Sequence, residues 1–179
     1  MNSIIISILL LGNYYSLDNM LSKEANKSTN NEKSIIINQN NIAEEPYNIK
    51  LQIYKVKNNQ YRLEVKMDLA EGSYFVSPHS KGSYKGIFNI SIEGKNKLST
   101  NGNLLEVPRS VEQIDPWKNS LASIVNENTT YKQTFTIVPQ NDFEVTGLVR
   151  FVIEPRCTLE EVKFIISYYS GELKIKKTV

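Results

Sequence analysis

Cys157 is the residue best suited to covalent chemistry, and it is the only cysteine among 179 residues. It lies in a turn-like segment, 154–158 (Glu-Pro-Arg-Cys-Thr), between two runs of alternating apolar residues. Two interpretations stay open: a small, half-buried residue at a strand end, or an accessible thiol that forms a mixed disulfide with a partner. Because no second sulfur is present to resolve such an intermediate, the chain alone cannot run an intramolecular dithiol cycle.

The charges around Cys157 act in opposite directions on its thiolate. Arg156 favours the thiolate, whereas Glu154 and the pair Glu160-Glu161 oppose it. We therefore expect Cys157 to react with an alkylating reagent no faster than an ordinary free thiol.

The other residues with chemical potential do not form a recognisable site. His79, the only histidine, lies in a turn-rich stretch and is expected to be a solvated loop residue. A zinc site needs three or four ligands and a catalytic triad needs an oriented acid, and neither set is evident. The acidic pairs Glu44-Glu45 and Glu160-Glu161 are typical of a solvated surface. The sequence thus argues against a self-contained enzyme and predicts no cofactor and no metal.

The elements that position these residues alternate with a period of two. Five apolar residues (Tyr61, Leu63, Val65, Met67, Leu69) alternate with four charged ones (Arg62, Glu64, Lys66, Asp68). This pattern is typical of an antiparallel strand with one wet face. Similar short runs recur to the C-terminus, separated by turn residues such as Asn58-Asn59 and Asn101-Gly102. We predict an all-β fold, an immunoglobulin-like antiparallel β-sandwich of about eight or nine strands.

Two features interrupt the pattern. Residues 108–121 contain Asp115, Pro116 and Trp117 without periodicity, which predicts a long loop with at most one helical turn. Gly147, inside a run of inward-facing residues, predicts a bulge or a point of close approach.

Three segments are expected along the chain. Residues 1–22 include an apolar run at 4–11, which is the length of a signal-peptide core, although no basic residue precedes it and no cleavage site is evident. The alternative is a short buried helix or strand. Residues 23–45 are rich in Asn, Ser and Lys and predict a polar linker. Residues 46–179 form the sandwich domain, which we expect to be periplasmic or otherwise exported.

The composition argues against two classes of partner, nucleic acids and the membrane interior. The net charge of +2, with scattered Lys and Arg, argues against nucleic-acid binding. No apolar run approaches the length of a membrane span, so none is predicted in the mature domain.

The sequence resembles the N-terminal periplasmic domain of the transmembrane thiol:disulfide interchange protein DsbD. Elements of that family's pattern occur in the same order across most of residues 46–179. They are the segments 72–77 (Gly-Ser-Tyr-Phe-Val-Ser), 106–108 (Glu-Val-Pro), 115–117 (Asp-Pro-Trp), 131–135 (Tyr-Lys-Gln-Thr-Phe), 145–151 (Val-Thr-Gly-Leu-Val-Arg-Phe) and 157–164 (Cys-Thr-Leu-Glu-Glu-Val-Lys-Phe).

The resemblance implies roles for individual residues. Cys157 matches the second of the family's two redox cysteines, so it is the candidate redox thiol. Asp115, Trp117, Tyr74 and Phe75 would belong to the cap loop and the partner-binding surface, with Trp117 shielding the thiol. The alternative for Trp117 is a core or edge residue that anchors a long loop.

The sequence also departs from the family. The first cysteine would fall near Ile153 or Glu154, and neither is a thiol. The two prolines that follow the second cysteine are replaced by Leu159-Glu160. The resemblance therefore implies the fold and the compartment more strongly than the redox cycle.

Three functions follow from these observations. The first is a protein-binding module that has lost the dithiol cycle and binds through the Trp117 loop and the Cys157 turn. The second is a one-cysteine exchanger whose partner, a periplasmic thiol–disulfide protein, supplies the other sulfur. The third is a structural cell-envelope domain without specific chemistry.

Overall fold

The computed structural model describes residues 45–116, 118–138 and 141–178. These residues form eleven antiparallel strands and no helix. The prediction of an all-β antiparallel sandwich is confirmed, but the eight or nine strands expected are too few, since the described residues form eleven. The predicted leader at 1–22 and nearly all of the predicted linker lie outside the described residues, as does Trp117. Within the described ranges, the chain contains no helix that could serve as a membrane span.

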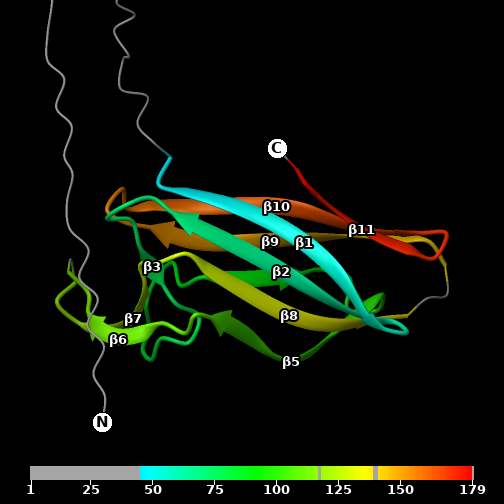
Figure 1. Ribbon diagram of the computed structural model, residues 1–179, viewed down its shortest axis with the longest axis horizontal. Helices are drawn as coiled ribbons and strands as arrows, with labels where there is room; N and C mark the ends of the chain where they lie inside the picture. Colours follow the sequence, from blue (N-terminus) through cyan, green and yellow to red (C-terminus); the bar gives the residue numbers. More distant parts are fainter. Residues whose placement is uncertain (1–44, 117, 139–140, 179) are drawn as a thin grey trace, which may run out of the picture. The chain divides into compact units, whose positions relative to one another are not determined.

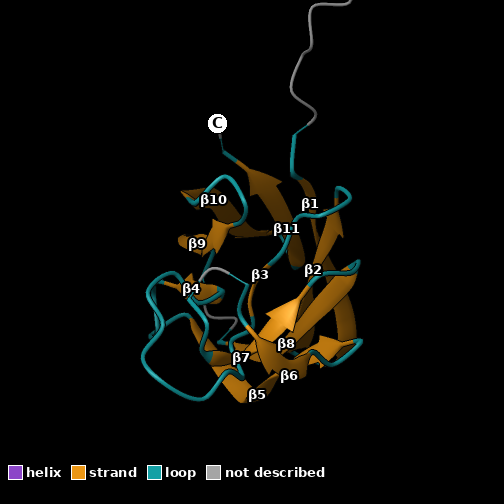
Figure 2. Cartoon of the chain, turned by 90° about the vertical axis from the view of Figure 1, so that its left-hand side faces the viewer, coloured by secondary structure: helices purple, strands orange, loops and turns teal. Residues whose placement is uncertain are grey.

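Two four-stranded sheets form the body of the domain (Figure 1). The first sheet contains, in spatial order, β1 (Tyr47–Lys57), β2 (Gln60–Leu69), β8 (Thr129–Ile137) and β5 (Leu98–Val107). The second contains β11 (Glu172–Lys177), β10 (Thr158–Tyr169), β9 (Phe143–Ile153) and β4 (Asn89–Ile92). Figure 2 shows the two sheets as separate layers, with β1 and β11 near each other along one side.

A third, smaller sheet lies at one end of the body (Figure 1). It contains β3 (Phe75–Val76), β7 (Leu121–Val125) and β6 (Val111–Ile114), in that order. The predicted loop at 108–121 is therefore wrong, because it contains β6 and the start of β7. All four residues of β6 are exposed. Since alternation of apolar and polar residues arises only where one face is buried, this strand left no periodic signal.

The predicted strands of the body match the structure where one face is buried. Leu63, Val65 and Met67 of β2 are fully buried, as the alternation predicted. Two details differ. Asn101-Gly102 is not a turn between strands but lies in an irregularity within β5, where the register against β8 shifts. Gly147 pairs in regular register with Phe164, so it is a close-approach point and not a bulge.

Gly147 is required by the core packing. A Cβ atom built on Gly147 would lie 2.1 Å from Cζ of Phe164, whose ring is buried over the glycine. Any side chain at this position would displace that ring from the close-packed interior.

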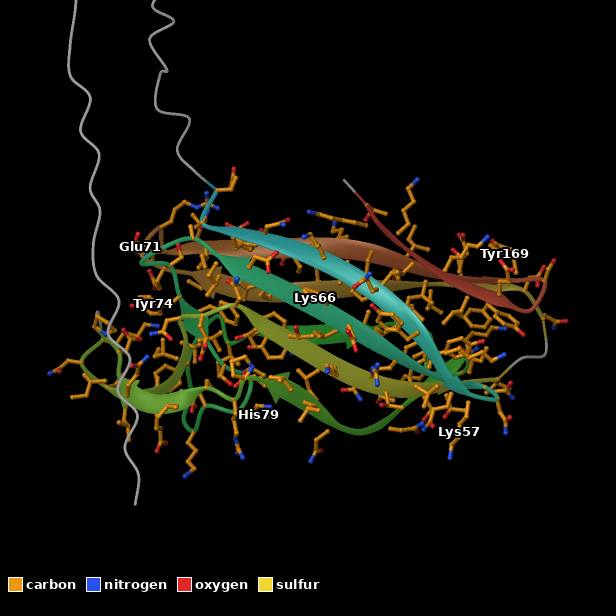
Figure 3. All side chains as sticks on the ribbon, viewed as in Figure 1. Lys57, Lys66, Glu71, Tyr74, His79 and Tyr169 are labelled. Carbon is orange, nitrogen blue, oxygen red and sulfur yellow. The ribbon has the colours of Figure 1, made fainter. Side chains whose placement is uncertain are left out.

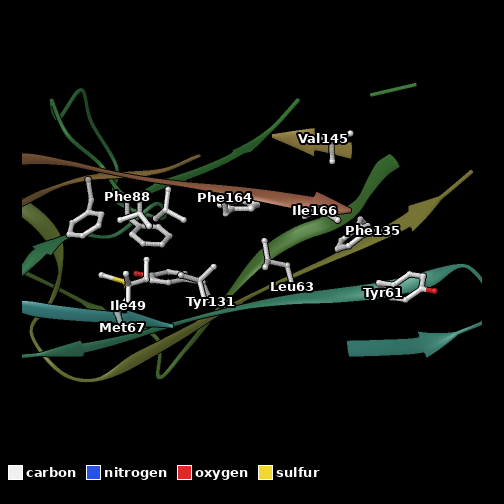
Figure 4. Packing of buried hydrophobic residues seen from close by; sticks show 14 of the residues in the cluster. Ile49, Tyr61, Leu63, Met67, Phe88, Tyr131, Phe135, Val145, Phe164 and Ile166 are labelled. Atoms are coloured by element: carbon white, nitrogen blue, oxygen red, sulfur yellow. The ribbon is translucent and has the colours of Figure 1, made fainter. Parts of the chain in front are cut away.

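The core between the sheets is rich in aromatic rings (Figure 4). Phe88 is fully buried and stacks on Tyr131, with a distance of 3.9 Å between ring centroids. A second, smaller cluster of Tyr74, Val76, Ala122 and Ile124 anchors the small sheet. The hairpin of β6 and β7 therefore packs on the rest of the domain through a small cluster, to which β7 contributes Ala122 and Ile124.

Candidate functional site

The Cys157 turn joins β9 to β10 at the end of the body where the small sheet lies. The backbone of Glu154 exchanges two hydrogen bonds with Tyr74: the Tyr74 amide donates to the Glu154 carbonyl at 3.1 Å, and the reverse bond is 2.8 Å. Cys157 is exposed and has a φ of 54°, the left-handed region that the tight turn requires. Of the two interpretations, the half-buried residue is therefore wrong, and the thiol is accessible.

The charges beside Cys157 are paired with one another. The Arg156 guanidinium lies 2.6 Å from Glu160 and 3.3 Å from Glu45. The Tyr47 hydroxyl donates to the second oxygen of Glu160 at 2.9 Å. Burial raises the pKa of Glu160, but the hydrogen bonds it accepts, led by that from Arg156, outweigh this and leave its pKa below the usual value. Two carboxylates thus share the positive charge of Arg156, so it does not act on the thiol alone.

Tyr74 and Asp115, both predicted from the sequence, meet at the base of the small sheet. Asp115 is 2% exposed, and one of its carboxylate oxygens accepts hydrogen bonds from the Tyr74 hydroxyl at 3.4 Å and the Lys118 amide at 3.2 Å. Burial, followed by the negative charges of Asp115 and Glu154, raises the pKa of Tyr74 to about 12.

A cleft of about 580 Å³ opens between these segments. It is lined by residues of four separate segments: Gly72, Ser73, Tyr74, Pro116, Asn126 and Pro155. Pro116 belongs to the loop that contains Asp115, and Pro155 belongs to the Cys157 turn. The segment that contains Asp115 and the Cys157 turn therefore border the same cleft. Figure 3 shows Tyr74 and Glu71 at this end, with Lys57 and Tyr169 at the opposite one.

Phe75 does not belong to the surface that the resemblance implied. Its side chain is 0% exposed, and its ring centroid lies 5.4 Å from that of Phe88 in the core. The predicted contact of Phe75 with a partner is corrected to a packing role. Phe75 is the first residue of β3, and successive residues of a strand point to opposite faces. Tyr74 consequently faces the small sheet and Phe75 faces the main core.

Glu106 forms a buried network that sequence reasoning missed. Its carboxylate is 4% exposed and accepts hydrogen bonds from the Ser77 hydroxyl at 2.7 Å, the Tyr131 hydroxyl at 2.9 Å and the Ser110 amide at 2.7 Å. Burial raises the pKa of Glu106, but these bonds outweigh burial and leave its pKa below the usual value. One signal in the sequence was available. Glu106 lies between the apolar residues Leu105 and Val107, and in β5 these two are exposed while Glu106 points inward.

The Glu106 network joins three elements beneath the hairpin. It connects the end of β5 to the segment after β3 through Ser77, and to the start of the hairpin through the Ser110 amide. The contacts fix the point at which the β6–β7 hairpin leaves the body. Through these hydrogen bonds, Glu106 holds the start of the hairpin against the body of the domain.

The hairpin exposes apolar side chains on both faces. Ile114 and Leu121, 63% and 56% exposed, lie on its outer face together with Glu112 and Ser123. Val111, 74% exposed, lies on the opposite face beside Ile124, and Val107 just before the hairpin is 43% exposed. Ile114 and Leu121 face each other across the two strands. Exposed apolar residues gathered on one hairpin are typical of an interaction surface.

His79 lies beside the hairpin, in a hollow that it lines with Ser110, Glu112 and Ser123. His79 is exposed, as predicted, and its amide donates to the Ser77 hydroxyl at 3.0 Å. Across the described ranges, no group of three or more His, Cys, Asp or Glu residues is placed to hold a metal ion.

Comparisons with known proteins show a weak similarity of fold. No protein-family model and no curated protein matches the chain. Among solved structures, the N-terminal domain of Neisseria meningitidis DsbD, in its reduced form, is similar over 74% of this chain and 91% of its own, with 9% sequence identity and a TM-score of 0.43. This similarity concerns the backbone fold and does not place the chain in the DsbD family.

Proposed function

We propose that the domain is an exported protein-binding module whose contact surface is the cleft end: the cleft, the 115–120 loop and the Cys157 turn. The observation that carries this proposal is the convergence of four chain segments on one cleft beside an exposed apolar hairpin. Loops gathered at one end of a sandwich are a common place for binding. The proposal of export rests on the apolar run at residues 4–11.

The chemistry of the cleft suits a protein segment better than a small charged ligand. Its walls combine the proline rings of Pro116 and Pro155 with the phenol of Tyr74 and the amide of Asn126. The carboxylate of Asp115, beside Pro116, is buried and accepts a hydrogen bond from the Tyr74 hydroxyl. Apolar rings with a few hydrogen-bonding groups are typical of surfaces that bind a polypeptide.

Site-specific crosslinking through the single cysteine tests this function. A benzophenone maleimide attached to Cys157 places a photoreactive group at the cleft end. The matched control is the double variant Asn58→Cys with Cys157→Ser, which places the same group on the β1–β2 turn at the opposite end of the body. In an envelope fraction of the source cells, we expect one protein to be crosslinked from Cys157 and not from position 58.

The outcome separates the proposal from a structural role. Replacement of Ile114 by Asp should abolish that crosslink, because it places a charge in the apolar contact. Equal crosslinking from both ends, or a product unaffected by Ile114→Asp and Trp117→Ala, would refute the binding surface and favour a structural cell-envelope domain.

A second candidate function, thiol exchange, is favoured by the exposure of Cys157 alone. In this reaction the Cys157 thiolate attacks a partner's disulfide, one sulfur of the partner leaves as a thiolate, and a mixed disulfide forms. A thiol from another molecule must then displace Cys157, because the chain has no second cysteine. We expect alkylation of Cys157 near pH 7 at the rate of glutathione. A rate ten times higher, with a mixed disulfide lost in Cys157→Ser, would establish exchange instead.

A further inference from the structure

β6 is the outermost strand of the small sheet and has one unpaired edge. The sheet order is β3-β7-β6, so β6 pairs with β7 on one side only. All four of its residues, Val111–Ile114, are exposed. The unpaired side of such a strand is a template for another extended segment.

The hydrogen-bond pattern shows which backbone groups face that edge. The Asp115 amide donates to the Ser120 carbonyl at 2.8 Å, immediately beyond the pair Ile114 and Leu121. In an antiparallel ladder, hydrogen-bonded and non-hydrogen-bonded pairs alternate, so Ile114 and Leu121 form a non-hydrogen-bonded pair. The N–H and C=O groups of Ile114, and those of Glu112 two residues earlier, therefore point away from β7.

Within the described residues, β6 contains no lysine, proline or bulge at this edge. Natural edge strands are blunted by lysine, by proline, by a bulge or by a covering segment. β6 has the sequence Val-Glu-Gln-Ile, and its register against β7 is unbroken. By contrast, β11, an edge strand of the second sheet, contains three lysines in six residues.

The side chains of β6 specify what a paired strand would contain. Glu112 and Ile114 lie on the same face of the hairpin, two residues apart. Ile114 is 63% exposed, and Glu112 forms none of the ion pairs found among the described residues. Cross-strand pairs of apolar residues and of opposite charges are favourable. A paired strand would thus place an apolar residue beside Ile114 and a basic residue beside Glu112.

The other face of β6 borders a groove. Val111 and Gln113 line it together with Pro108, Ile124 and Thr129, and its volume is about 220 Å³. The alternate side chains of a paired strand would enter here, which sets the second half of its specificity.

We propose that β6 accepts an extended segment of a protein partner by antiparallel strand addition, and that this segment carries an apolar and a basic residue two positions apart. The inference deepens the proposed function and rests on it in one respect, the existence of a protein partner.

A synthetic peptide tests the edge without that partner. The probe is acetyl-Thr-Leu-Val-Lys-Val-Thr-amide, which in antiparallel pairing places leucine beside Ile114 and lysine beside Glu112. It is titrated into the ¹⁵N-labelled full chain. We expect saturable shifts of the Glu112 and Ile114 amide signals at submillimolar peptide, with hydrogen exchange of these two amides slowed at least about tenfold.

Two controls separate strand addition from other contacts. The same peptide methylated on the backbone nitrogens of leucine and lysine cannot donate to β6 and should not bind. In the variant Glu112→Lys, the lysine peptide should bind about fivefold more weakly, and a peptide with glutamate in place of lysine should bind better than it does to the unmodified chain.

The inference is overturned by any of three results: no saturable shift at β6 up to 5 mM peptide, shifts at the edge of β4 instead, or shifts that depend on protein concentration without peptide. The last result would mean that a second copy of the chain occupies the edge. Peptide binding at β6 without crosslinking at Cys157 would retain this inference and refute the proposed function, whereas the reverse result would do the opposite.

Discussion

The body of the sandwich and the β6–β7 hairpin differ in where they place large apolar side chains. In the body, Leu63, Val65 and Phe88 are fully buried between the two sheets. In the hairpin, Ile114 and Leu121 are each more than half exposed on the outer face. Burial of apolar surface stabilises the body, and it cannot do so for the outer face of the hairpin. The difference separates residues that maintain the fold from residues that are available for binding.

The largest expected effect is the removal of an aromatic ring from the body. Phe88→Ala leaves a cavity beside Tyr131, on which the ring stacks, and is expected to lower the free energy of unfolding by about 3–5 kcal/mol. Urea denaturation followed by tryptophan fluorescence or circular dichroism measures the change. A loss below about 1 kcal/mol would mean that the body is not held by this core, and the contrast with the hairpin would fail.

The next largest loss of stability is expected at Glu106, where the hairpin joins the body. Glu106→Gln puts an NH₂ group where the hydroxyls of Ser77 and Tyr131 now donate, which is expected to cost about 2 kcal/mol at pH 7. The exposed Glu112→Gln is the matched control and should change stability by less than about 0.5 kcal/mol. Equal effects of the two variants would contradict a buried role for Glu106.

The same residue predicts a dependence on pH. The pKa of Glu106 is lower in the folded chain than its ordinary value of 4.5, so its contribution is present at neutral pH and is lost as the pH falls below about 4.5. Glu106→Gln should therefore lose less stability than the unmodified chain between pH 6 and pH 3. Parallel pH curves for the two proteins would show that Glu106 contributes nothing through its charge.

Large apolar side chains on the outer face of the hairpin are expected to tolerate replacement by polar ones, whereas those in the core of the body are not. Ile114→Ser together with Leu121→Ser should change the free energy of unfolding by less than about 1 kcal/mol, since both side chains are exposed. The same double variant should lose the crosslink from Cys157. A large loss of stability would show that the pair maintains the fold, which would remove the distinction between the regions.

The smallest expected effect is at the Cys157 turn. Cys157 has a φ of 54°, which glycine adopts without strain, so Cys157→Gly should leave stability unchanged or raise it by up to about 1 kcal/mol. Cys157→Ala, which keeps the Cβ atom, should not stabilise the chain. Destabilisation by glycine would indicate that the thiol itself makes a packing contact.

The two regions also differ in how far the sequence predicted them. Alternation predicted β2 and its buried face because one side of that strand packs on the core. It failed for β6, where all four residues are exposed, and it gave no indication that Glu106 is buried among hydroxyl groups. The resemblance assigned Tyr74, Asp115 and Phe75 to one surface. Tyr74 and Asp115 are hydrogen bonded to each other, but Phe75 is buried in the core. Sequence similarity does not distinguish the two faces of a short strand.

The contacts of Arg156 and Glu160 have a mechanical consequence. Glu45 and Tyr47, at the beginning of the described chain, are held by Arg156 and Glu160 on either side of Cys157. Tension applied through the upstream polypeptide would load the ion pair of Glu45 with Arg156 together with the first bond of the β1–β2 ladder, in which the Ala70 amide donates to the Pro46 carbonyl. A pull on this end of the chain would thus be transmitted both to the β1–β2 edge and to the turn that displays the sulfur.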